Sequence, residues 1–325
     1  MRVFRHLDEI PPTFGPTVLS IGNFDGVHCG HRKVLGEVVT RARALGAQAV
    51  AVTFDPHPTR VLRPEASPKL IAPLPLKLKL LESTGLDAAL VLPFTSELSA
   101  TAPQDFAQRI IAEKLQAREV HEGASFHFGH RAEGNVDRLA EFGQKFGFRV
   151  VAYREMQLRG ETVSSSRIRQ LLLQGRVGRA RTLLGRNFSI FGAPASGRGY
   201  GSRYTVPTIN LAPYPELVPA NGVYITQTHL ANESFDSVTN IGVRPTFGEP
   251  SFAIETHLLN FRPLALSETT NIEIKFLKWL RPEMKFPGAE ALRRQIGHDV
   301  QLAQRYFRLQ QRLVSTSPRP ATPLP

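Results

Sequence analysis

The segment VLSIGNFDGVHCGH, residues 18–31, decides the fold of the first half of the chain. Its apolar start, Val18 to Ile21, is strand-like, and the glycines that follow permit turns and close backbone approaches that side chains would block. From His31 onward the apolar residues recur at helical spacing, so we expect His28 and His31 to lie at or just before a helix N-terminus. Unpaired N–H groups and the helix dipole favour an anion there, and imidazoles can donate to charge that develops in phosphoryl chemistry. The segment therefore predicts a nucleotide site.

The length and composition are those of a two-domain globular protein. The chain has 325 residues, enough for two cores, with 42% hydrophobic and 21% charged residues. No apolar run reaches the roughly 18 residues of a membrane span, and the first residues, MRVFRHLDEIPPTF, lack the apolar core of a secretory signal. The single cysteine, Cys29, excludes an intramolecular disulfide and a Cys-rich zinc site. We therefore expect a cytoplasmic protein.

The formal charge of +12 and the pI near 10.2 allow two interpretations. A basic surface can bind nucleic acid through its phosphates, or it can attract small anionic substrates. Basic residues form only short clusters such as Arg293-Arg294, without an interleaved aromatic stripe. Nucleic acid is therefore the minority explanation, and we do not expect it as a partner.

The first half of the chain alternates between strand-like and helical patterns. We expect strands at residues 18–24, 49–54, 88–94, 118–122 and 148–153, and helices near residues 31–45, 76–84, 104–115 and 136–146. This alternation predicts a parallel, doubly wound sheet, which binds ligands at the carboxyl ends of its strands.

The pattern changes after Gly185. Strand-like segments at residues 189–195, 223–230, 236–241, 252–261 and 271–280 are joined by turn residues without helices between them, which predicts an antiparallel sheet or small barrel. A helix near residues 288–311 follows, with Leu292, Ile296, Val300, Ala303 and Phe307 spaced to pack on that sheet. The end of the chain is rich in Pro, Ser and Thr, and we expect residues 313–325 to be disordered.

A second anion site is predicted where Ser164, Ser165 and Ser166 open a helix that carries Arg167 and Arg169. Taken alone, the serines can simply cap the helix, and the arginines can form a solvated face. The two histidines of the first turn can likewise cap a helix or bind zinc, but zinc needs a third ligand that the sequence does not supply. Two phosphate-binding helix starts within one α/β domain favour the nucleotide interpretation.

Three motifs of the first half resemble those of a known family: GNFDGVHCGH, TFDPHP at residues 53–58 and SSSRIR at residues 164–169. They are similar to the adenylyltransferase module of the prokaryotic bifunctional riboflavin kinase/FMN adenylyltransferases, also called FAD synthetases. The resemblance implies a Rossmann-like nucleotidyltransferase domain over residues 1–185. It also implies a six-stranded antiparallel flavokinase β-barrel with a C-terminal helix over residues 186–312.

The same resemblance implies two reactions. Riboflavin and ATP would give FMN, and the FMN phosphate would then attack the α-phosphorus of MgATP to give FAD and pyrophosphate. Positioning and charge neutralisation would account for most of the reduction in the reaction barrier, and no covalent enzyme intermediate would be required. The expected ligands are riboflavin, FMN, FAD and ATP, with Mg²⁺ as cofactor, whereas the sequence leaves the oligomeric state open.

In the first domain the resemblance assigns the ATP phosphates to the two predicted helix starts. His28 and His31 would hold the triphosphate and stabilise the departing pyrophosphate, and Arg169 would close on the phosphates from the other side. The backbone of residues 22–24 would border the adenosine. The nucleotide-binding residues implied for this domain are Gly22, Asn23, Phe24, Asp25, Gly26, Gly30, Ser165 and Ser166.

In the second domain the residues PTIN, 207–210, resemble the flavokinase signature. Thr208 and Asn210 lie two residues apart on a strand, so they share a face, and their oxygens suit Mg²⁺. An ordinary strand with a proline at its start is the alternative. The resemblance implies that Thr208 and Asn210 hold the metal and that Glu255 takes the proton from the riboflavin 5′-hydroxyl. The glycines expected to contact phosphate in this domain are Gly197, Gly199 and Gly201.

Two departures from the family pattern concern function. Thr205 replaces a glycine in the phosphate loop and cannot easily adopt a positive φ, and Ser125 stands where the family has Asp or Asn. His57 is expected either to support the residues that contact the ligand, without contacting it itself, or to be a structural residue of the turn. Two alternative functions remain: an adenylyltransferase with a weak or silent kinase barrel, and a nucleic-acid-binding protein on a nucleotidyltransferase fold.

Overall fold

The computed structural model describes residues 1–195, 208–230, 233–244, 251–260 and 270–316. They form two compact units. The first contains residues 1–169 and 183–185, and the second contains residues 170–182 together with the chain from residue 186 onward. The domain boundary expected at residues 185 and 186 stays a prediction.

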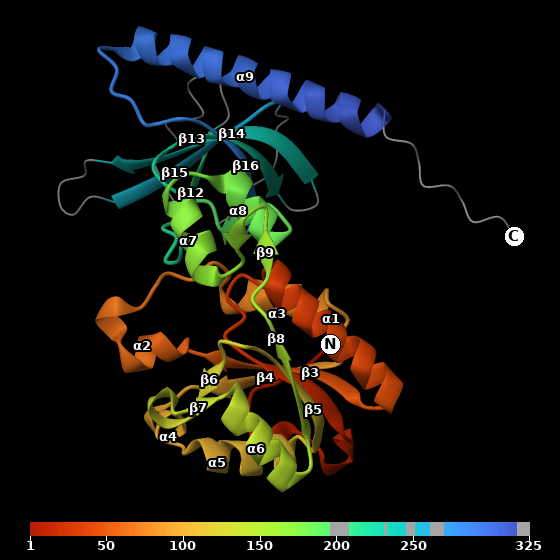
Figure 1. Cartoon of the computed structure of the whole chain (residues 1–325). Coiled ribbons are helices and arrows are strands. Elements are labelled where there is room, and N and C mark those ends of the chain that lie inside the picture. Colours follow the sequence, from red (N-terminus) through yellow and green to blue (C-terminus); the bar gives the residue numbers. More distant parts are fainter. Residues whose placement is uncertain (196–207, 231–232, 245–250, 261–269, 317–325) are drawn as a thin grey trace, which may run out of the picture. The chain divides into compact units, whose positions relative to one another are not determined.

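The first unit is built on a six-stranded sheet of parallel strands in the order β1-β4-β3-β2-β5-β8 (Figure 1). Its strands are β1 (Arg2–Phe4), β2 (Thr17–Ile21), β3 (Gln48–Asp55), β4 (Ala88–Pro93), β5 (Ala117–Gly123) and β8 (Arg149–Tyr153). From β2 the chain adds β3 and β4 on one side, then returns to place β5 and β8 on the other. The predicted doubly wound sheet is confirmed, and its direction of growth reverses between β2 and β5, where such sheets leave a ligand crevice.

Helices cover both faces of this sheet, which is why its strands read as continuous apolar runs. Val18 packs with residues of α1 (Cys29–Leu45) and α3 (Leu74–Glu82), whereas Leu19 faces η4 (Phe106–Lys114) and α6 (Val136–Phe146). The helix expected at residues 104–115 is formed by α5 (Pro103–Asp105) and η4, a π-helix.

The remaining short elements of the first unit connect these layers. They are η1 (Leu7–Glu9), η2 (Pro12–Phe14), α2 (Pro58–Leu62), η3 (Pro64–Ala66), α4 (Ser96–Ser99), β6 (His127–Phe128), η5 (His130–Ala132), β7 (Gly134–Asn135), β9 (Gln157–Leu158) and β10 (Glu161–Thr162). Two further helices follow, α7 (Ser165–Leu173) and α8 (Val177–Leu184), and their residues 170–182 belong to the second unit.

The turn between β2 and α1 depends on glycine. The strand ends at Ile21, three residues before the predicted end, because Phe24 and Gly26 adopt φ values of 46° and 77°. A Cβ on Gly26 would lie 2.9 Å from the Ile71 side chain. Any other residue at position 26 would therefore combine backbone strain with a clash.

The second unit contains six antiparallel strands in the order β11-β16-β13-β14-β15-β12. They are β11 (Phe188–Gly192), β12 (Thr208–Leu211), β13 (Gly222–Leu230), β14 (Glu233–Arg244), β15 (Ser251–Leu258) and β16 (Ile272–Arg281). A bridge between Pro194 and Leu211 joins the continuation of β11 to β12. It is flanked by hydrogen bonds from the Ala195 amide to the Asn210 carbonyl, 2.8 Å, and from the Ala212 amide to the Ala193 carbonyl, 2.9 Å. The first and last strands thus meet, and the predicted barrel is confirmed.

A chain of hydroxyl groups crosses the interior of this barrel. Thr226 and Thr239 are joined at 2.7 Å, and Thr239 continues to Thr256 at 2.8 Å. On the other side Ser237 bridges Thr226 and Thr228, at 2.8 Å to each. All of these side chains are buried. Each hydroxyl depends on its neighbours for a partner, so the chain ties β13, β14 and β15 in one register.

The C-terminal helix α9 (Ala289–Thr316) lies across the barrel strands (Figure 1). Ala303 and Phe307 pack on a cluster from β13 and β14, as predicted. The expected packing of Leu292 and Ile296 is wrong, because these side chains are 41% and 38% exposed. Burial on α9 begins only at Asp299, whose carboxylate meets the Arg281 guanidinium at 2.7 Å, so the first turns of the helix precede its contact with the strands.

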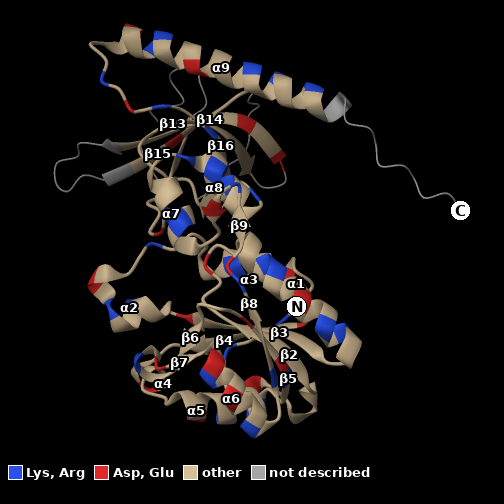
Figure 2. Ribbon diagram, in the orientation of Figure 1, with Lys and Arg blue, Asp and Glu red and all other residues tan. Residues whose placement is uncertain are grey.

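The helix α9 extends beyond its predicted end at residue 311 and includes residues 313–316 of the expected tail. The rest of that tail, residues 317–325, lies outside the described residues. Within the described residues, no helix combines the length and the apolar character that crossing a membrane requires. Lys and Arg are spread over the helices of both units (Figure 2). Helices α7 and α8 carry Arg but no Asp or Glu.

Candidate functional site

A cavity of about 1070 Å³ opens in the first unit at the carboxyl ends of the sheet strands. Its walls come from the turn after β2, the segment after β5 and the residues that lead into α7. This is the place where the strand order reverses and where ligands bind in open α/β sheets. The predicted site residues that line it are Gly22, Asn23, Phe24, Asp25, His28, Gly30, His31 and Ser165.

The two histidines lie face to face at the start of α1. Their ring centroids are 3.6 Å apart and the planes differ by 15°. His28 is the N-cap of α1, because its Nδ1 accepts the backbone N–H of His31 at 3.3 Å. A nitrogen that accepts carries no proton, so the proton of the neutral His28 ring is on Nε2. Burial, the nearby His28 and the charge of Lys77 hold the pKa of His31 well below its ordinary value, so His31 is neutral at pH 7.

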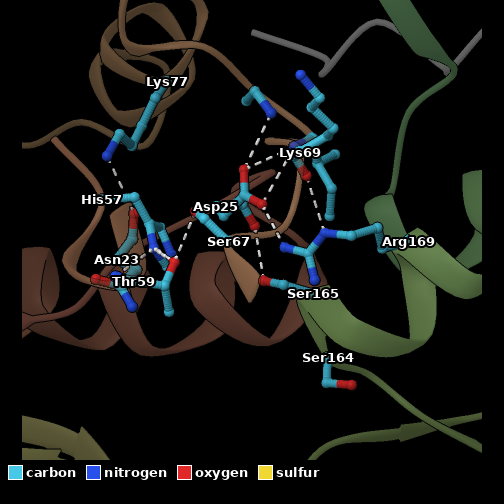
Figure 3. Close-up of polar contacts among 12 residues, drawn as sticks. Asn23, Asp25, His57, Thr59, Ser67, Lys69, Lys77, Ser164, Ser165 and Arg169 are labelled. Carbon is cyan, nitrogen blue, oxygen red and sulfur yellow. Dashed lines mark hydrogen bonds and ion pairs between the residues drawn. The ribbon is translucent and has the colours of Figure 1, made fainter. Parts of the chain in front are cut away.

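Asp25 is buried and its carboxylate is fully engaged (Figure 3). It accepts the backbone N–H groups of Ile71, at 3.0 and 3.1 Å, and Ala72, at 3.0 Å. The Arg169 guanidinium donates to the same carboxylate at 2.8 Å. The Asp25 side chain therefore binds protein groups, and what it contributes is the position of the turn.

Arg169 and Ser165 fasten the start of α7 to that turn. Arg169 Nε donates to the Lys69 carbonyl at 3.0 Å, and the Ser165 hydroxyl donates to the Asp25 carbonyl at 2.9 Å. Ser164 is the helix cap, since its hydroxyl accepts the Arg167 backbone N–H at 3.2 Å. The structure thus brings the two predicted anion sites to one turn of the chain.

Other predicted residues of this unit lie near the turn or at the rim of the cavity. Gly26 and Ser166 do not line the cavity, and Ser166 is exposed. Ser125 is an exposed residue of the cavity wall. His57 is the N-cap of α2, where its Nδ1 accepts the Thr59 backbone N–H at 3.3 Å.

Glu122 is a site residue that the sequence reasoning missed. It is a buried carboxyl at the end of β5, it lines the cavity, and it accepts the Ile21 backbone N–H at 2.5 Å. The Ser20 hydroxyl also donates to it, yet burial dominates and raises the pKa of Glu122 well above its ordinary value. The sequence does contain a signal for this residue, because a glutamate near the end of a strand-like apolar segment can lie at the ligand-binding edge of the sheet.

The other missed residue is Lys77, which is buried on α3. It stands where helical spacing from Leu74 to Leu81 calls for an apolar side chain, which is a signal that periodicity could have supplied.

One part of the cavity wall is aromatic. Phe54 and Phe94 meet edge to face at 5.6 Å between ring centroids, and Phe126 stacks on Phe128 at 5.4 Å. Phe106 packs against Phe128 at 5.9 Å. All of these rings line the cavity, so it joins a polar wall at the turn after β2 to a wall suited to a flat apolar ring system.

The predicted kinase residues of the second unit lie together on the barrel. Asn210 on β12 and Glu255 on β15 are cross-strand partners, and Thr208 lies two residues from Asn210 on the same face. Asn240 on β14 is the partner of Glu255 on its other side, a neighbour that the sequence alone did not predict. Hydroxyl, amide and carboxylate oxygens in this arrangement fit the ligand preference of Mg²⁺.

Gly197, Gly199, Gly201 and Thr205 lie outside the described residues. Among the residues that are described, no group of three or more His, Cys, Asp or Glu side chains is placed to hold a metal ion.

Two family models match the chain in succession. The model for FAD synthetase matches residues 11–167, and the model for riboflavin kinase matches residues 184–307.

Curated relatives match nearly the whole chain, and each is named a bifunctional riboflavin kinase/FMN adenylyltransferase. The relative from Pseudomonas fluorescens is 34% identical and covers 93% of this chain and 97% of its own. The relative from Buchnera aphidicola of Schizaphis graminum is 31% identical over 95% of this chain and 100% of its own. That from Escherichia coli K12 is 30% identical over 90% of this chain and 93% of its own.

A crystal structure of a protein from Streptococcus pneumoniae, described as a macrolide-efflux protein, has the same fold. Its TM-score is 0.82, with 24% sequence identity over 93% of this chain and 98% of that one. At this identity the likeness concerns the fold alone.

Proposed function

The chain belongs to the family of bifunctional riboflavin kinase/FMN adenylyltransferases, and on this premise we propose how its two sites make FAD. The protein phosphorylates riboflavin with ATP to FMN and then transfers the adenylyl group of a second ATP to FMN. The observation that carries the proposal is the cavity at the reversal point of the sheet, where the histidine pair and the start of α7 meet at one turn.

In the adenylyl transfer, a phosphate oxygen of FMN attacks the α-phosphorus of ATP. The bond from that phosphorus to the bridging oxygen breaks, and pyrophosphate leaves. Negative charge grows on the leaving group, and we assign its stabilisation to His28, His31 and the N–H groups at the start of α1. His28 supports this role because its cap fixes the proton on Nε2, where it can donate.

We assign Arg169 a supporting position in the same reaction. It is bound to the Asp25 carboxylate and the Lys69 carbonyl, so its guanidinium is held beside the turn whose backbone borders the nucleotide. Asp25, Ser165 and Arg169 together keep that turn in one conformation, which is a positioning contribution to the rate.

We assign the flavin ring of FMN to the aromatic wall formed by Phe54, Phe94, Phe126 and Phe128. A flat ring system of that size stacks favourably on such surfaces. The adenosine then occupies the part of the cavity beside residues 22–24, so that the two phosphate groups meet at the histidines.

In the kinase reaction we assign Glu255 the role of general base for the 5′-hydroxyl of riboflavin. Thr208 and Asn210 would hold Mg²⁺, which neutralises phosphate charge when it is bound. The support is the cross-strand pairing of Asn210 with Glu255, which puts the base and a metal ligand side by side. A cytoplasmic location stays a prediction.

The test is to incubate the purified protein with riboflavin, ATP and Mg²⁺ and to separate the flavins over time. We expect FMN to appear first and FAD to follow. FAD formed only from added FMN would contradict the kinase assignment. Salt-sensitive binding of nucleic acid without any flavin turnover would overturn the proposal as a whole.

A further inference from the structure

Lys77 is a buried lysine next to the nucleotide cavity, and the chemistry assigned above leaves it without a role. Its side chain is 5% exposed, and Nζ donates to three oxygens that carry no formal charge. These are the Asn23 carbonyl at 3.2 Å, the Thr53 hydroxyl at 3.1 Å and the Phe54 carbonyl at 3.4 Å. The three N–H bonds of the ammonium group are thus satisfied, and Figure 3 shows Lys77 reaching toward Asn23 from the α3 side.

Among the described residues, no carboxylate lies in contact with the ammonium group of Lys77. In the part of the chain that the structure describes, no ion pair within 4.0 Å includes its ammonium group. Burial lowers the pKa of Lys77, and the more distant Asp25 and Asp55 oppose that shift. A buried charge without a paired counter-charge costs stability. Lys77 is therefore a buried cation that no neighbouring carboxylate neutralises within the described residues.

The position of Lys77 relates that cation to the active site. Its hydrogen-bond partners Asn23 and Phe54 line the cavity, whereas Lys77 lies behind them. The amides of Ile71 and Ala72, just before α3, hold the Asp25 carboxylate of the same turn. The turn after β2 is thus held at two points by α3 and the residues that lead into it.

Resting on the function proposed above, we propose that Lys77 is a positioning residue of the adenylyltransferase site. Its ammonium group holds the Asn23 carbonyl in place, and its unneutralised positive charge, set behind the cavity wall, attracts the triphosphate of ATP. A bound polyphosphate would supply a counter-charge to this ammonium group. The contribution of Lys77 is to ATP binding, because it does not reach the reacting atoms.

Other charged and titratable groups share this region. Burial is the main cause that lowers the pKa of His31 and of His57. His28 and Lys77 lower that of His31 further, and for His57 Asp25 opposes the effect of burial whereas Lys77, Arg169 and Arg60 add to it. Removing the charge at position 77 therefore raises the pKa of His31, because the positive charge of Lys77, which disfavours the protonated form of His31, is gone. This effect reports on the charge of Lys77 in the absence of nucleotide.

The test compares Lys77→Gln and Lys77→Met with Lys79→Met, a matched control on the exposed face of the same helix. Glutamine can still donate hydrogen bonds but has no charge. We expect the KM for ATP in FAD formation to rise about tenfold or more in both position-77 variants, as the loss of a partly buried charge interaction predicts. We also expect FMN formation and the Lys79→Met variant to be unchanged.

The second measurement is an NMR titration of the His31 ring without nucleotide, which requires no turnover. We expect its midpoint to rise in Lys77→Gln and to stay in place in Lys79→Met. If Lys77→Met does not fold, Lys77→Gln carries both measurements. An unchanged KM for ATP in Lys77→Gln would overturn the proposal, and an unchanged His31 midpoint would show that the charge of Lys77 does not act on the site. Failure of the unaltered protein to form FAD would instead refute the proposed function and leave the His31 titration as the test of the charge.

Discussion

The carboxylate of Asp25 and the guanidinium of Arg169 form an ion pair in which Nη2 lies 2.8 Å from Oδ2. The two residues are 144 positions apart in the sequence. Both side chains are largely buried, and the same carboxylate accepts two backbone N–H groups. The pair therefore fastens the turn after β2 to the start of α7, the two segments that the sequence marks as anion sites.

Asp25→Ala should lower both stability and FAD formation. The change leaves Arg169 and the amides of Ile71 and Ala72 without their acceptor, which costs about 3 kcal/mol in unfolding free energy. We expect FAD formation to fall at least about tenfold because the turn is no longer held. Arg43→Ala is the control, since it breaks an ion pair with Asp87 in which Arg43 is largely exposed. It should cost less than about 1 kcal/mol, and equal losses in urea unfolding would contradict the assignment.

His31→Ala should abolish FAD formation while FMN formation continues. Loss of one donor to the developing charge of the leaving pyrophosphate commonly costs about 10²–10³ in rate. The measurement is the initial rate of each reaction, with riboflavin or FMN as the starting flavin. If both rates fall together, the two sites are not independent.

Glu255→Gln should have the opposite selectivity. Glutamine keeps the size of the side chain next to Asn210 but cannot take a proton, so FMN formation should fall by about 10²–10⁴. FAD formation from added FMN should stay near that of the unaltered protein. A kinase rate that survives this substitution would exclude Glu255 as the base.

Glu122→Gln should change how stability depends on pH. Burial raises the pKa of Glu122 well above that of the unfolded chain, so between these two pKa values only the folded state holds the proton. The stability of the unaltered protein then falls as pH rises through this window, which begins near the ordinary value of 4.5. Glutamine has no such proton, so the variant should gain stability relative to the unaltered protein between pH 5 and pH 8.

Urea unfolding at both pH values measures that gain. Glu133→Gln, at an exposed position near the same cavity, is the matched control and should follow the unaltered protein. If the unfolding free energies of Glu122→Gln and of the unaltered protein change equally between the two pH values, the buried carboxyl ionises as readily as an exposed one.

Thr239→Val should destabilise the barrel although it preserves the shape of the side chain. It removes one hydroxyl of the buried chain and deprives Thr226 and Thr256 of a partner, which costs about 1–3 kcal/mol. Thr40→Val, on the exposed face of α1, should change stability by less than about 0.5 kcal/mol. Similar unfolding midpoints for both variants would mean that the hydroxyl chain adds nothing to the fold.

Much of the fold could be predicted because local patterns dominate it. The apolar run from Val18 and the helical spacing after His31 predict β2 and α1, and turn residues after Gly185 predict antiparallel strands. Strand order and weak elements could not be predicted, because they depend on distant pairing. The three residues of β1 carry no strand signal of their own and gain order only beside β4.

The candidate site likewise contains some residues that the sequence predicts and others that it does not. The histidines and serines stand in motifs, so the sequence indicates them directly. Lys77 and Glu122 are isolated charged residues, and their role depends on burial that only the folded chain creates. Asp25 stands in a motif, but its contacts with Ile71, Ala72 and Arg169 depend on distant segments and could not be predicted from that motif.

His28 has two separate properties: its Nδ1 caps α1, which contributes to folding, and its other ring nitrogen is the one that we assign to the reaction. Asn, Asp, Ser and Thr all cap helices well, so each could replace His28 with little loss of folding free energy. None of them offers the ring N–H to which we assign the stabilisation of the leaving pyrophosphate. A descendant of this protein could thus lose adenylyl transfer by a single change and keep its shape, so likeness of fold at this turn is a poor guide to activity.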